Sequence, residues 1–596
     1  MKRQNLDLAV IGNCRVAGLL DCNARIVWWC FPRLDSNPVF SRLLAGDEEK
    51  GFCDILLDDL VDAQTSYVHN TAIVETTLTD ARGGAIRITD FMPRFGRFER
   101  TFRPAMIVRR IEPISGLPRV TIRIRPTFDY GRKASEIALG SNHIRYIGSD
   151  QVVRVTTDAP LSYIAQEAPF ALLRPVALMM GPDEPILSAI PTTAREFQDR
   201  TRDYWLAWVR GLAVPYEWQL AVIRAAITLK LCSFEETGGI VAALTTSIPE
   251  APGTSRNWDY RYCWLRDSYF VVNALNRLGT TQTMEAYIDY ITTVVAERDR
   301  PVAPVHSIVP GSPLEESTAP DLKGFLGHGP VRVGNQAAEQ IQHDAYGSVV
   351  LGASQMFIDE RLPKKGDEPM LQRLEELGKR AVRFALTPDA GLWEYRGRQR
   401  IHTYSVVLCW AACNRLWLIA SRLGEKDRAA RWREHAERLK AEILSRGWNE
   451  KRGAFVGAFD HTDLDASVLL IAELGLVPPQ DEKFIRTVDT IGRELTRNGR
   501  IMRYIAEDDF GVPDTAFLVC GFWYIDALAA IGRVSEAKDM FVDILNHTNV
   551  FGILSEDLHP QAGELWGNFP QTYSMAGIIN SATRLSLKWE EAWSHA

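Results

Sequence analysis

Hydrophobic and polar residues alternate along the first third of the chain. Short segments of period two, among them AIVETTLTD, GAIRITDFMP and RVTIRIRPTF, follow one another and are separated by Gly, Pro, Asp and Asn turns. Alternation of this kind is typical of strands with one buried face, and many short strands without a helical period between them favour a β-sandwich. We therefore predict an N-terminal antiparallel β-sandwich over residues 1–192.

The hydrophobic period becomes helical after Pro191. The segment TTAREFQDRTRDYWLAWVRGL has apolar positions three and four apart, which predicts a linker helix over residues 193–215. Later helical segments are of two kinds: VVLCWAACNRLWLIASRLG is apolar nearly all round, whereas DRAARWREHAERLKAEILSRG is amphipathic. This mixture indicates an inner ring of buried helices inside an outer ring, a helical barrel over residues 216–596. A helical solenoid is the alternative, but the sequence has no self-similar period.

Composition narrows the functional classes. The chain is 46% hydrophobic and 24% charged, as in ordinary globular proteins. A net charge of −7 without a run of basic residues argues against a nucleic-acid partner. Asp7, Asn13 and Arg15 interrupt any apolar signal region, and the apolar stretch 517–532 contains Asp526 and is shorter than the ~20 residues of a membrane span. We expect a cytoplasmic protein without a membrane partner, and a homo-oligomer is compatible with the sequence.

The cysteines agree with a reducing compartment. There are nine of them, an odd number, with no CxxC pair. Cys409 and Cys413 are spaced for one face of a helix, but no His or Cys cluster stands near them to complete a zinc site. We therefore expect neither a metal nor an organic cofactor.

Candidate chemistry begins in RNWDYRYCWLRDSYF, residues 256–270. Arg266 and Asp267 stand side by side at a predicted helix start, where a planar donor fork beside a carboxylate can hold vicinal sugar hydroxyls. The alternative is that Asp267 caps the helix while Arg266 pairs with another acid. The segment GHGPVRVGNQAAEQIQHDAYG adds the polar residues Gln340, His343 and Asp344, which are weak evidence alone.

Two further loops supply carboxylates. In PDAGLWEYRG, Glu394 follows Trp393 among aromatic residues, which should desolvate the carboxyl group and raise its pKa, as a general acid requires. In GILSEDLHPQAGELWGNFPQTYSMAGIIN, Glu556, Asp557 and Glu564 share one loop. An exposed acidic loop is the alternative for both segments. Two separated carboxylates, aromatic walls and a hydroxyl clamp together favour glycoside hydrolysis by an acid and a base.

Ordered motifs along nearly the whole chain resemble glycoside hydrolase family 15, which includes bacterial glucoamylases, glucodextranases and one type of α,α-trehalase. They include NWDYRYCWLRDS, GPVRVGNQAAEQIQHDAYG, GLWEYRG, HTYSVVLCWAACNR, RYIAEDDFGVPDTAFLVCGFWYIDAL and LSEDLHPQAGELWGNFPQTYSMAGIIN. The resemblance implies a β-sandwich, a linker helix and a catalytic (α/α)6 barrel.

The resemblance also implies roles for individual residues. It puts the general acid at Glu394 in GLWE and the general base at Glu556 in LSED. Arg266 and Asp267 fall on the pair that holds the terminal glucosyl unit. By the same resemblance, Tyr260 and Trp264 would line the first subsite, with Tyr260 near the attacking water. Trp393 is a further expected substrate-binding residue. Two positions depart from the family, Val406 in place of a frequent Lys and Met575 in place of a frequent His, and both are expected to reshape subsites.

The expected function is that of an inverting, exo-acting α-glucosidase. It would release β-D-glucose from the non-reducing end of a small soluble glucoside, α,α-trehalose or a short maltooligosaccharide, without a cofactor. Three alternatives stay open: an α-1,6-glucohydrolase of the isomaltose or dextran type, a glucoside phosphorylase, which would lack a functional carboxylate at position 556, and a non-catalytic sugar-binding regulatory protein, which would lack the acid or the base.

Overall fold

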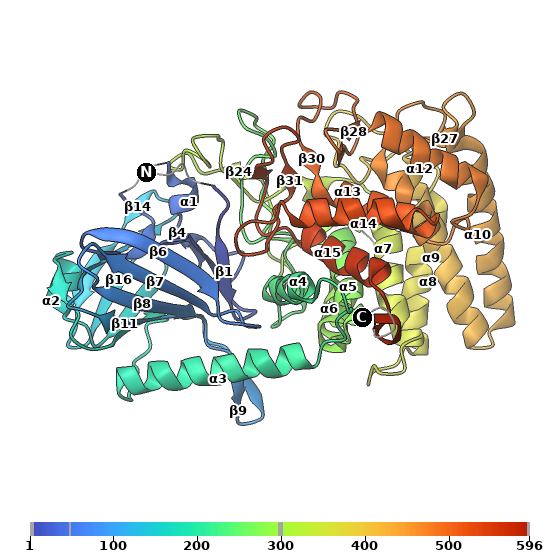
Figure 1. Cartoon of the computed structure of the whole chain (residues 1–596). Coiled ribbons are helices and arrows are strands. Elements are labelled where there is room, and N and C mark those ends of the chain that lie inside the picture. Colours follow the sequence, from blue (N-terminus) through green and yellow to red (C-terminus); the bar gives the residue numbers. More distant parts are fainter. Residues whose placement is uncertain (1–4, 47–48, 296–301, 593–596) are drawn as a thin grey trace.

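The computed structural model describes residues 5–46, 49–295 and 302–592. A part built from antiparallel sheets and a part built from helices lie side by side, and helix α3 (Ile190–Arg210) runs beneath the sheets toward the helices (Figure 1). The first third of the chain and the remainder therefore form two structurally distinct parts.

Two large antiparallel sheets make up the first part. The first sheet has the order β1-β2-β3-β5-β12-β18, with β4 paired to β3, and the second has the order β15-β16-β17-β19-β11-β8-β7-β6. In β12, Val120, Ile122 and Ile124 are buried and alternate with more exposed residues, as the period-two pattern predicted.

The strands of the first sheet are β1 (Ala9–Gly12), β2 (Ala17–Leu20), β3 (Ile26–Cys30), β4 (Pro38–Phe40), β5 (Phe52–Leu57), β12 (Arg119–Arg125) and β18 (Phe170–Ala171). Those of the second are β6 (Leu60–Tyr67), β7 (Val74–Asp80), β8 (Ala85–Phe91), β11 (Ile107–Ser115), β15 (Glu136–Leu139), β16 (His143–Ile147), β17 (Val152–Thr157) and β19 (Val176–Gly181). Smaller elements beside them are α1 (Arg42–Ala45), α2 (Leu161–Ala165), β9 (Phe95–Arg97), β10 (Arg100–Phe102), β13 (Thr127–Phe128) and β14 (Lys133–Ala134).

Helices of the second part form two concentric rings. The inner helices contact one another in a closed circle, α5, α7, α9, α11 with the preceding 3-10 turn, α13 and α15, and each outer helix packs against inner neighbours. The inner members are α5 (Leu265–Arg277), α7 (Asp344–Ser354), α9 (Thr403–Arg422), α11 (Leu470–Glu473), α13 (Leu518–Ala530) and α15 (Thr572–Leu585). The outer members are α4 (Gln219–Leu231), α6 (Thr281–Val294), α8 (Glu368–Phe384), α10 (Lys426–Arg446), α12 (Glu482–Glu494) and α14 (Val534–Leu545).

Short strands and 3-10 turns lie in the loops between these helices. The 3-10 turns are η1 (Gln336–Glu339), η2 (Gln355–Phe357) and η3 (Ala466–Leu469), and α16 (Trp589–Ala592) follows the last ring helix. Two-residue strands pair as β20 (Ser233–Phe234) with β21 (Gly239–Ile240), β22 (Cys263–Trp264) with β23 (Val305–His306), β24 (Ser317–Thr318) with β25 (Arg332–Val333), β26 (Trp448–Asn449) with β27 (Ala454–Phe455), β28 (Thr496–Arg497) with β29 (Arg500–Ile501), and β30 (Ala516–Phe517) with β31 (Asp557–Leu558) and β32 (Leu565–Trp566).

Inner helices are buried on nearly all sides. Every residue of α7 is buried, and a Cβ atom on its Gly347 would stand 2.3 Å from the carbonyl oxygen of Leu408 in α9. Glycine at this position therefore lets the two inner helices approach closely. The helix-ring prediction, an apolar inner ring within an amphipathic outer ring, is confirmed.

Helix α9 is long and apolar enough to cross a membrane by length and composition alone. However, 78% of its most apolar window is buried inside the protein, in the inner ring, and a core helix passes the same test. The apolar stretch 517–532, which the sequence analysis compares with a membrane span, forms α13.

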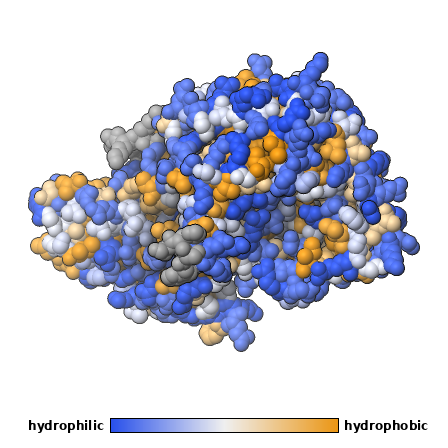
Figure 2. Space-filling view, turned by 45° about the vertical axis from the view of Figure 1, so that its right-hand side comes forward, coloured by the Kyte–Doolittle hydropathy of each residue, from blue (hydrophilic) through white to orange (hydrophobic). Residues whose placement is uncertain are grey.

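The outer face seen in Figure 2 is largely hydrophilic, with hydrophobic residues in scattered groups.

The helix predicted at residues 193–215 lies at residues 190–210. It begins earlier because Pro191 occupies its first turn, where a missing N–H costs nothing, and it ends at Gly211. The division of the chain at residues 192 and 215 stays a prediction. All nine cysteines lie in the described part of the chain, where none of them forms a disulfide bond, and eight of them are buried.

A buried arginine joins the sheets to the helical part. The Arg261 guanidinium is fully buried and donates to both carboxylate oxygens of Asp259, at 2.9 and 2.7 Å. It also donates to the Ser36 carbonyl and to the Tyr130 hydroxyl, each at 2.8 Å, and both of these belong to the sandwich. The segment around residue 260 is thus fixed from the side of the sandwich.

Candidate active site

A pocket opens at the end of the barrel where the inner helices begin. It encloses about 800 Å³ of space when its open mouth is included. Its walls come from loops that lead into α5, α7, α9, α13 and α15, so the closure of the ring brings together residues far apart in sequence. Of the predicted site residues, those that line the pocket are Tyr260, Trp264, Arg266, Asp267, Trp393 and Glu394.

Glu394 is held in a strained loop just before α9. Its φ is 61°, in the left-handed region that non-glycine residues rarely adopt, and such strain is typical of functional sites. The Trp264 indole N–H donates to its carboxylate at 2.6 Å, and Gln342 donates at 3.4 Å. Burial raises the pKa of Glu394, while Arg266 and the Trp264 hydrogen bond act in the opposite direction. The result favours a carboxyl group that holds its proton.

Arg266 and Asp267 occupy the first turn of α5 and are 7% exposed each. The Arg266 guanidinium donates to Gln342 at 3.0 Å and to Asp344 at 3.1 Å, and it lies 3.6 Å from the Glu394 carboxylate. Asp267 does not cap the helix, because no side chain does so at α5. Burial raises the pKa of Asp267 to about 7. Arg266 does pair with another acid, Asp344, as the alternative interpretation allowed.

Several polar atoms around the pocket have no hydrogen-bond partner among the described residues. Buried polar groups are nearly always paired, so such a gathering in one pocket is the pattern that a polar ligand with several hydroxyl groups would complete. These atoms are Arg266 Nε, Asp267 Oδ1, Gln571 Nε2 and the Tyr573 hydroxyl.

Glu556 lies behind the pocket wall and does not line it. It is 1% exposed, and its carboxylate accepts hydrogen bonds from the Tyr260 hydroxyl at 2.6 Å and from the Asn568 N–H at 3.4 Å. Gly567, with a φ of 75°, leaves room for it, because a Cβ there would stand 2.8 Å from a Glu556 carboxylate oxygen. Glu556 therefore reaches the pocket through Tyr260, whose hydroxyl it holds.

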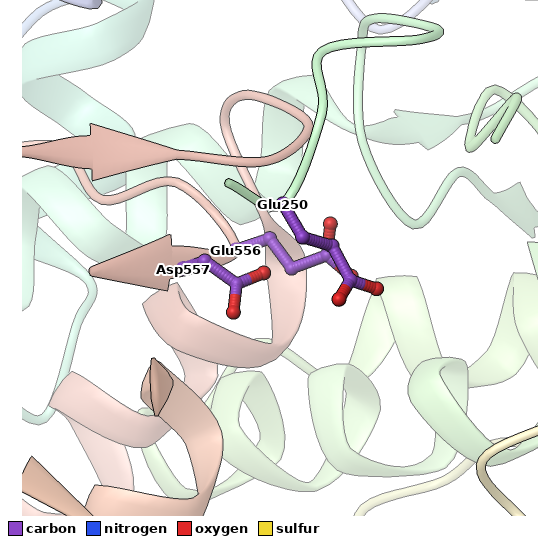
Figure 3. A group of neighbouring side chains, drawn as sticks. All are labelled: Glu250, Glu556 and Asp557. Carbon is purple, nitrogen blue, oxygen red and sulfur yellow. The ribbon is translucent and has the colours of Figure 1, made fainter. Parts of the chain in front are cut away.

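Three carboxyl groups meet at this point, as Figure 3 shows. Oxygen atoms of Glu250, Glu556 and Asp557 lie within 4.8 Å of one another, and all three residues are buried. Burial raises the pKa of Glu556 well above its ordinary value, the charges of Asp557 and Glu250 add to this, and Tyr260 and Arg503 oppose it. Carboxylate oxygens in such a group can hold a hard cation. Here Arg503 supplies positive charge, because its guanidinium bonds both oxygens of Glu250.

Two aromatic side chains connect the two candidate catalytic acids. Trp264 donates to Glu394 and Tyr260 donates to Glu556, and the two rings pack edge to face with centroids 5.3 Å apart. The carboxyl groups thus do not contact each other but stand on either side of an aromatic pair. In this arrangement one carboxyl group could donate a proton to a bound substrate, and the other could accept a proton from a second group.

Sequence comparison adds two family matches. The model of "Glycosyl hydrolases family 15" matches residues 219–583, and that of "Trehalase-like, N-terminal" matches residues 4–166. The chain belongs to glycosyl hydrolase family 15. It is therefore a glycosidase, as the motifs predicted.

Relatives of this family 15 glycosidase are similar along nearly their full length. A trehalase of Thermoplasma volcanium is 30% identical over 602 residues, covering 96% of this chain and 92% of the relative. A trehalase of Mycobacterium tuberculosis is 30% identical over 625 residues, covering 98% and 90%. The crystal structure of bacterial glucoamylase complexed with acarbose matches with a TM-score of 0.70 at 12% identity, over 98% of this chain and 94% of that one. This likeness confirms the predicted fold class.

Sequence reasoning missed part of the family 15 pocket. Glu250 carries no local signal, and Arg503 lies in the RYIAEDDF segment of the resemblance but was not singled out, although both line the pocket. Asp344, considered weak evidence, contacts Arg266. Val406 and Met575 were expected to reshape subsites, but neither lines the pocket; both are fully buried within inner helices, where their side chains pack the ring.

Proposed function

We propose that this glycosidase hydrolyses α,α-trehalose with inversion and releases one α-glucose and one β-glucose. The support is the set of relatives named trehalase, whose similarity extends over both parts of the chain. The second candidate is the release of β-glucose from short maltooligosaccharides, which the likeness to a glucoamylase fold motivates. Both activities occur on the same barrel, so family membership does not distinguish them. The two substrates differ in the leaving group, and the leaving group that the pocket accepts decides between the two activities.

In this proposal Glu394 is the general acid. It donates its proton to the glycosidic oxygen as the bond to the anomeric carbon breaks. Burial, which raises the pKa of Glu394, favours the protonated form before reaction. Once the proton has left, the Trp264 N–H at 2.6 Å and the Arg266 guanidinium at 3.6 Å stabilise the carboxylate.

Glu556 is the proposed general base. A water bound to the pocket side of the Tyr260 hydroxyl would give a proton to that hydroxyl while the hydroxyl passes its own proton to Glu556. The same water would attack the anomeric carbon from the face opposite the leaving oxygen. Burial raises the pKa of Glu556, while the Tyr260 hydrogen bond and the charge of Arg503 lower it, and Glu556 would act as base above this raised pKa. Glu250 is the competing candidate, because it lines the pocket while Glu556 lies behind Tyr260.

Arg266 and Asp267 would hold the hydroxyl groups of the reacting glucose. Arg266 Nε and Asp267 Oδ1 lie 3.6 Å apart and have no hydrogen-bond partner among the described residues. Together with the Gln571 amide and the Tyr573 hydroxyl, they would supply donors and acceptors for several hydroxyls. Binding energy gathered there, away from the anomeric carbon, orients the sugar between acid and base. The observation that carries the proposal is the edge-to-face pair of Trp264 and Tyr260, whose N–H and hydroxyl each bind one of the two proposed catalytic carboxyl groups.

A proton NMR time course tests substrate and stereochemistry together. The purified protein is incubated with trehalose and, in parallel, with maltotriose, and the anomeric signals are read before mutarotation equalises them. Equal early signals of α- and β-glucose from trehalose support the proposal. Glucose from maltotriose only would contradict the proposed substrate, and α-glucose alone from trehalose would contradict inversion. A phosphate-containing sample read for glucose phosphate tests the phosphorylase alternative.

Three variants test the assignment of roles. Glu394→Gln and Glu556→Gln should each lower kcat on trehalose by about 10²- to 10⁴-fold, the usual contribution of an acid or base. α-Glucosyl fluoride, whose leaving group needs little protonation, should restore most of the rate of the first variant but not of the second. Glu250→Gln is the matched control: a larger loss there than in Glu556→Gln, on both substrates, would move the role of base to Glu250.

A further inference from the structure

Charged residues on three loops are bonded to one another beside the pocket. Arg396 and Asp509 line the pocket, and Asp509 is exposed, whereas the residues at its floor are buried. Glu316 directly precedes β24 and stands behind Arg396, which it binds. We call Glu316, Arg396 and Asp509 the rim network.

Asp509 is fixed to the loop that carries the candidate acid. One of its carboxylate oxygens accepts the Arg396 N–H at 2.6 Å and the other accepts the Gly397 N–H at 2.8 Å. A Cβ on Gly397 would stand 2.4 Å from the Asp509 carboxylate, so only glycine permits this approach. Two loops from different gaps of the helix ring are thereby joined at the mouth.

Glu316 joins the third loop to the other two. Its carboxylate accepts hydrogen bonds from the Arg396 guanidinium at 3.2 and 2.8 Å and from Arg332 at 2.9 Å, and its side chain is 13% exposed. Burial alone would raise the pKa of Glu316, but the arginine hydrogen bonds outweigh it and hold the pKa below its ordinary value. The network is therefore charged at neutral pH, and bidentate arginine–carboxylate pairs of this kind are rigid.

A second brace supports the same rim from the inside. The Arg256 guanidinium bonds both carboxylate oxygens of Asp508, beside Asp509, and donates to the Gly511 carbonyl at 2.6 Å. The Trp258 and Phe510 rings, both in the pocket wall, meet edge to face with centroids 5.6 Å apart. The loop at residues 508–511 is therefore held against the pocket along its whole length.

We propose that the rim network limits the substrate to two sugar units by closing the pocket mouth behind the second one. The inference rests on the proposed function, since it describes the leaving-group end of the same site. A third unit would have to displace either Asp509 or the Arg396 side chain. Two backbone N–H groups hold the Asp509 carboxylate, and Glu316 holds the Arg396 guanidinium. Rejection of longer chains then comes from a fixed wall and not from weaker binding of the first glucose.

The test compares substrates that differ by one sugar. Rates are measured as kcat/KM for trehalose against its α-1,4-glucosylated trisaccharide, and for maltose against maltotriose. The native protein should prefer the shorter member by about tenfold or more. Asp509→Ala should reduce this preference by a similar factor, and Glu316→Gln should reduce it less, because it keeps the side-chain shape. Glu507→Gln, an exposed acid in the same loop, is the matched control and should leave the preference unchanged.

The outcomes separate this inference from the proposed function. Equal rates of the native protein on both members of a pair, or an equal loss by Asp509→Ala on both members, would overturn the length limit. If trehalose is not cleaved but maltose is preferred to maltotriose, and Asp509→Ala removes that preference, the proposed substrate is wrong while the length limit stands. Circular dichroism of each variant distinguishes a changed preference from misfolding, which would lower both rates together.

Discussion

Replacing Asp557 by asparagine tests the electrostatics of the carboxyl group cluster. Oxygens of Asp557 and Glu556 lie within 4.8 Å of each other. Two unit charges at this distance repel by about 3.5 kcal/mol at an effective dielectric constant of about 20. At about 1.36 kcal/mol for each pKa unit, this equals about 2.5 units. Arg503 offsets part of the repulsion, so the Glu556 pKa should fall in this variant by less than the repulsion alone would give.

The sign of the effect follows from the proposed role of Glu556 as base. Burial, then the charge of Asp557, raises the pKa of Glu556, so activity should rise with pH through a value above that of an ordinary glutamate. The amide introduced by Asp557→Asn carries no charge, so the Glu556 pKa should fall. The acidic limb of kcat/KM against pH would then move to lower pH, while the rate well above both pKa values changes little.

The assay is the initial rate of glucose release across the pH range in which the protein stays folded. Glu564→Gln is the matched control, because Glu564 is an exposed acid in the same β31–β32 hairpin and its loss should leave the limb in place. An acidic limb that does not move in Asp557→Asn would show that Asp557 is already neutral when Glu556 titrates, and it would refute the argument from like charges.

Three further substitutions have defined outcomes. Trp264→Phe removes the N–H that lowers the pKa of Glu394, so the alkaline limb of the pH profile should move upward by about one unit; an unmoved limb would contradict the role of Glu394 as acid. Gly567→Ala should reduce kcat at least about tenfold with little change in KM, because its methyl group would displace the Glu556 carboxylate, and unchanged kinetics would contradict this. Gly347→Ala should lower the free energy of unfolding by about 1–3 kcal/mol, the usual cost of overpacking, as read by chemical denaturation.

The fold could be predicted because its two halves have different periods. The alternation in β12 and the hydrophobicity of α9 on nearly all sides each depend on the surroundings of one segment, which a local sequence pattern encodes. The predicted ends of α3 are less accurate, because Pro191 belongs to the first turn of the helix and not to the boundary before it. Proline occurs both just before a helix and in its first turn, so the residues around Pro191 do not decide where the helix begins.

The candidate site was predictable only in part. Arg266 and Asp267 are adjacent in sequence, so their proximity needed no fold, whereas the bonds from Arg266 to Gln342 and Asp344 exist because α5 and α7 are neighbours in the ring. The proximity of Glu250 to Glu556 likewise depends on the fold, because it arises only when the first and last loops of the barrel come together. Contacts of this kind depend on ring closure, which no short sequence window contains.

The buried guanidinium of Arg261 has a consequence for how this enzyme can be divided. Arg261 follows Tyr260 in the sequence and donates hydrogen bonds to the Ser36 carbonyl and the Tyr130 hydroxyl of the sandwich. A barrel expressed alone would leave this cation without those two partners, and a buried charge that loses partners is strongly destabilising. The sandwich thus completes the interior of the helical part, and we expect a barrel separated from it by truncation or gene fission to be unstable.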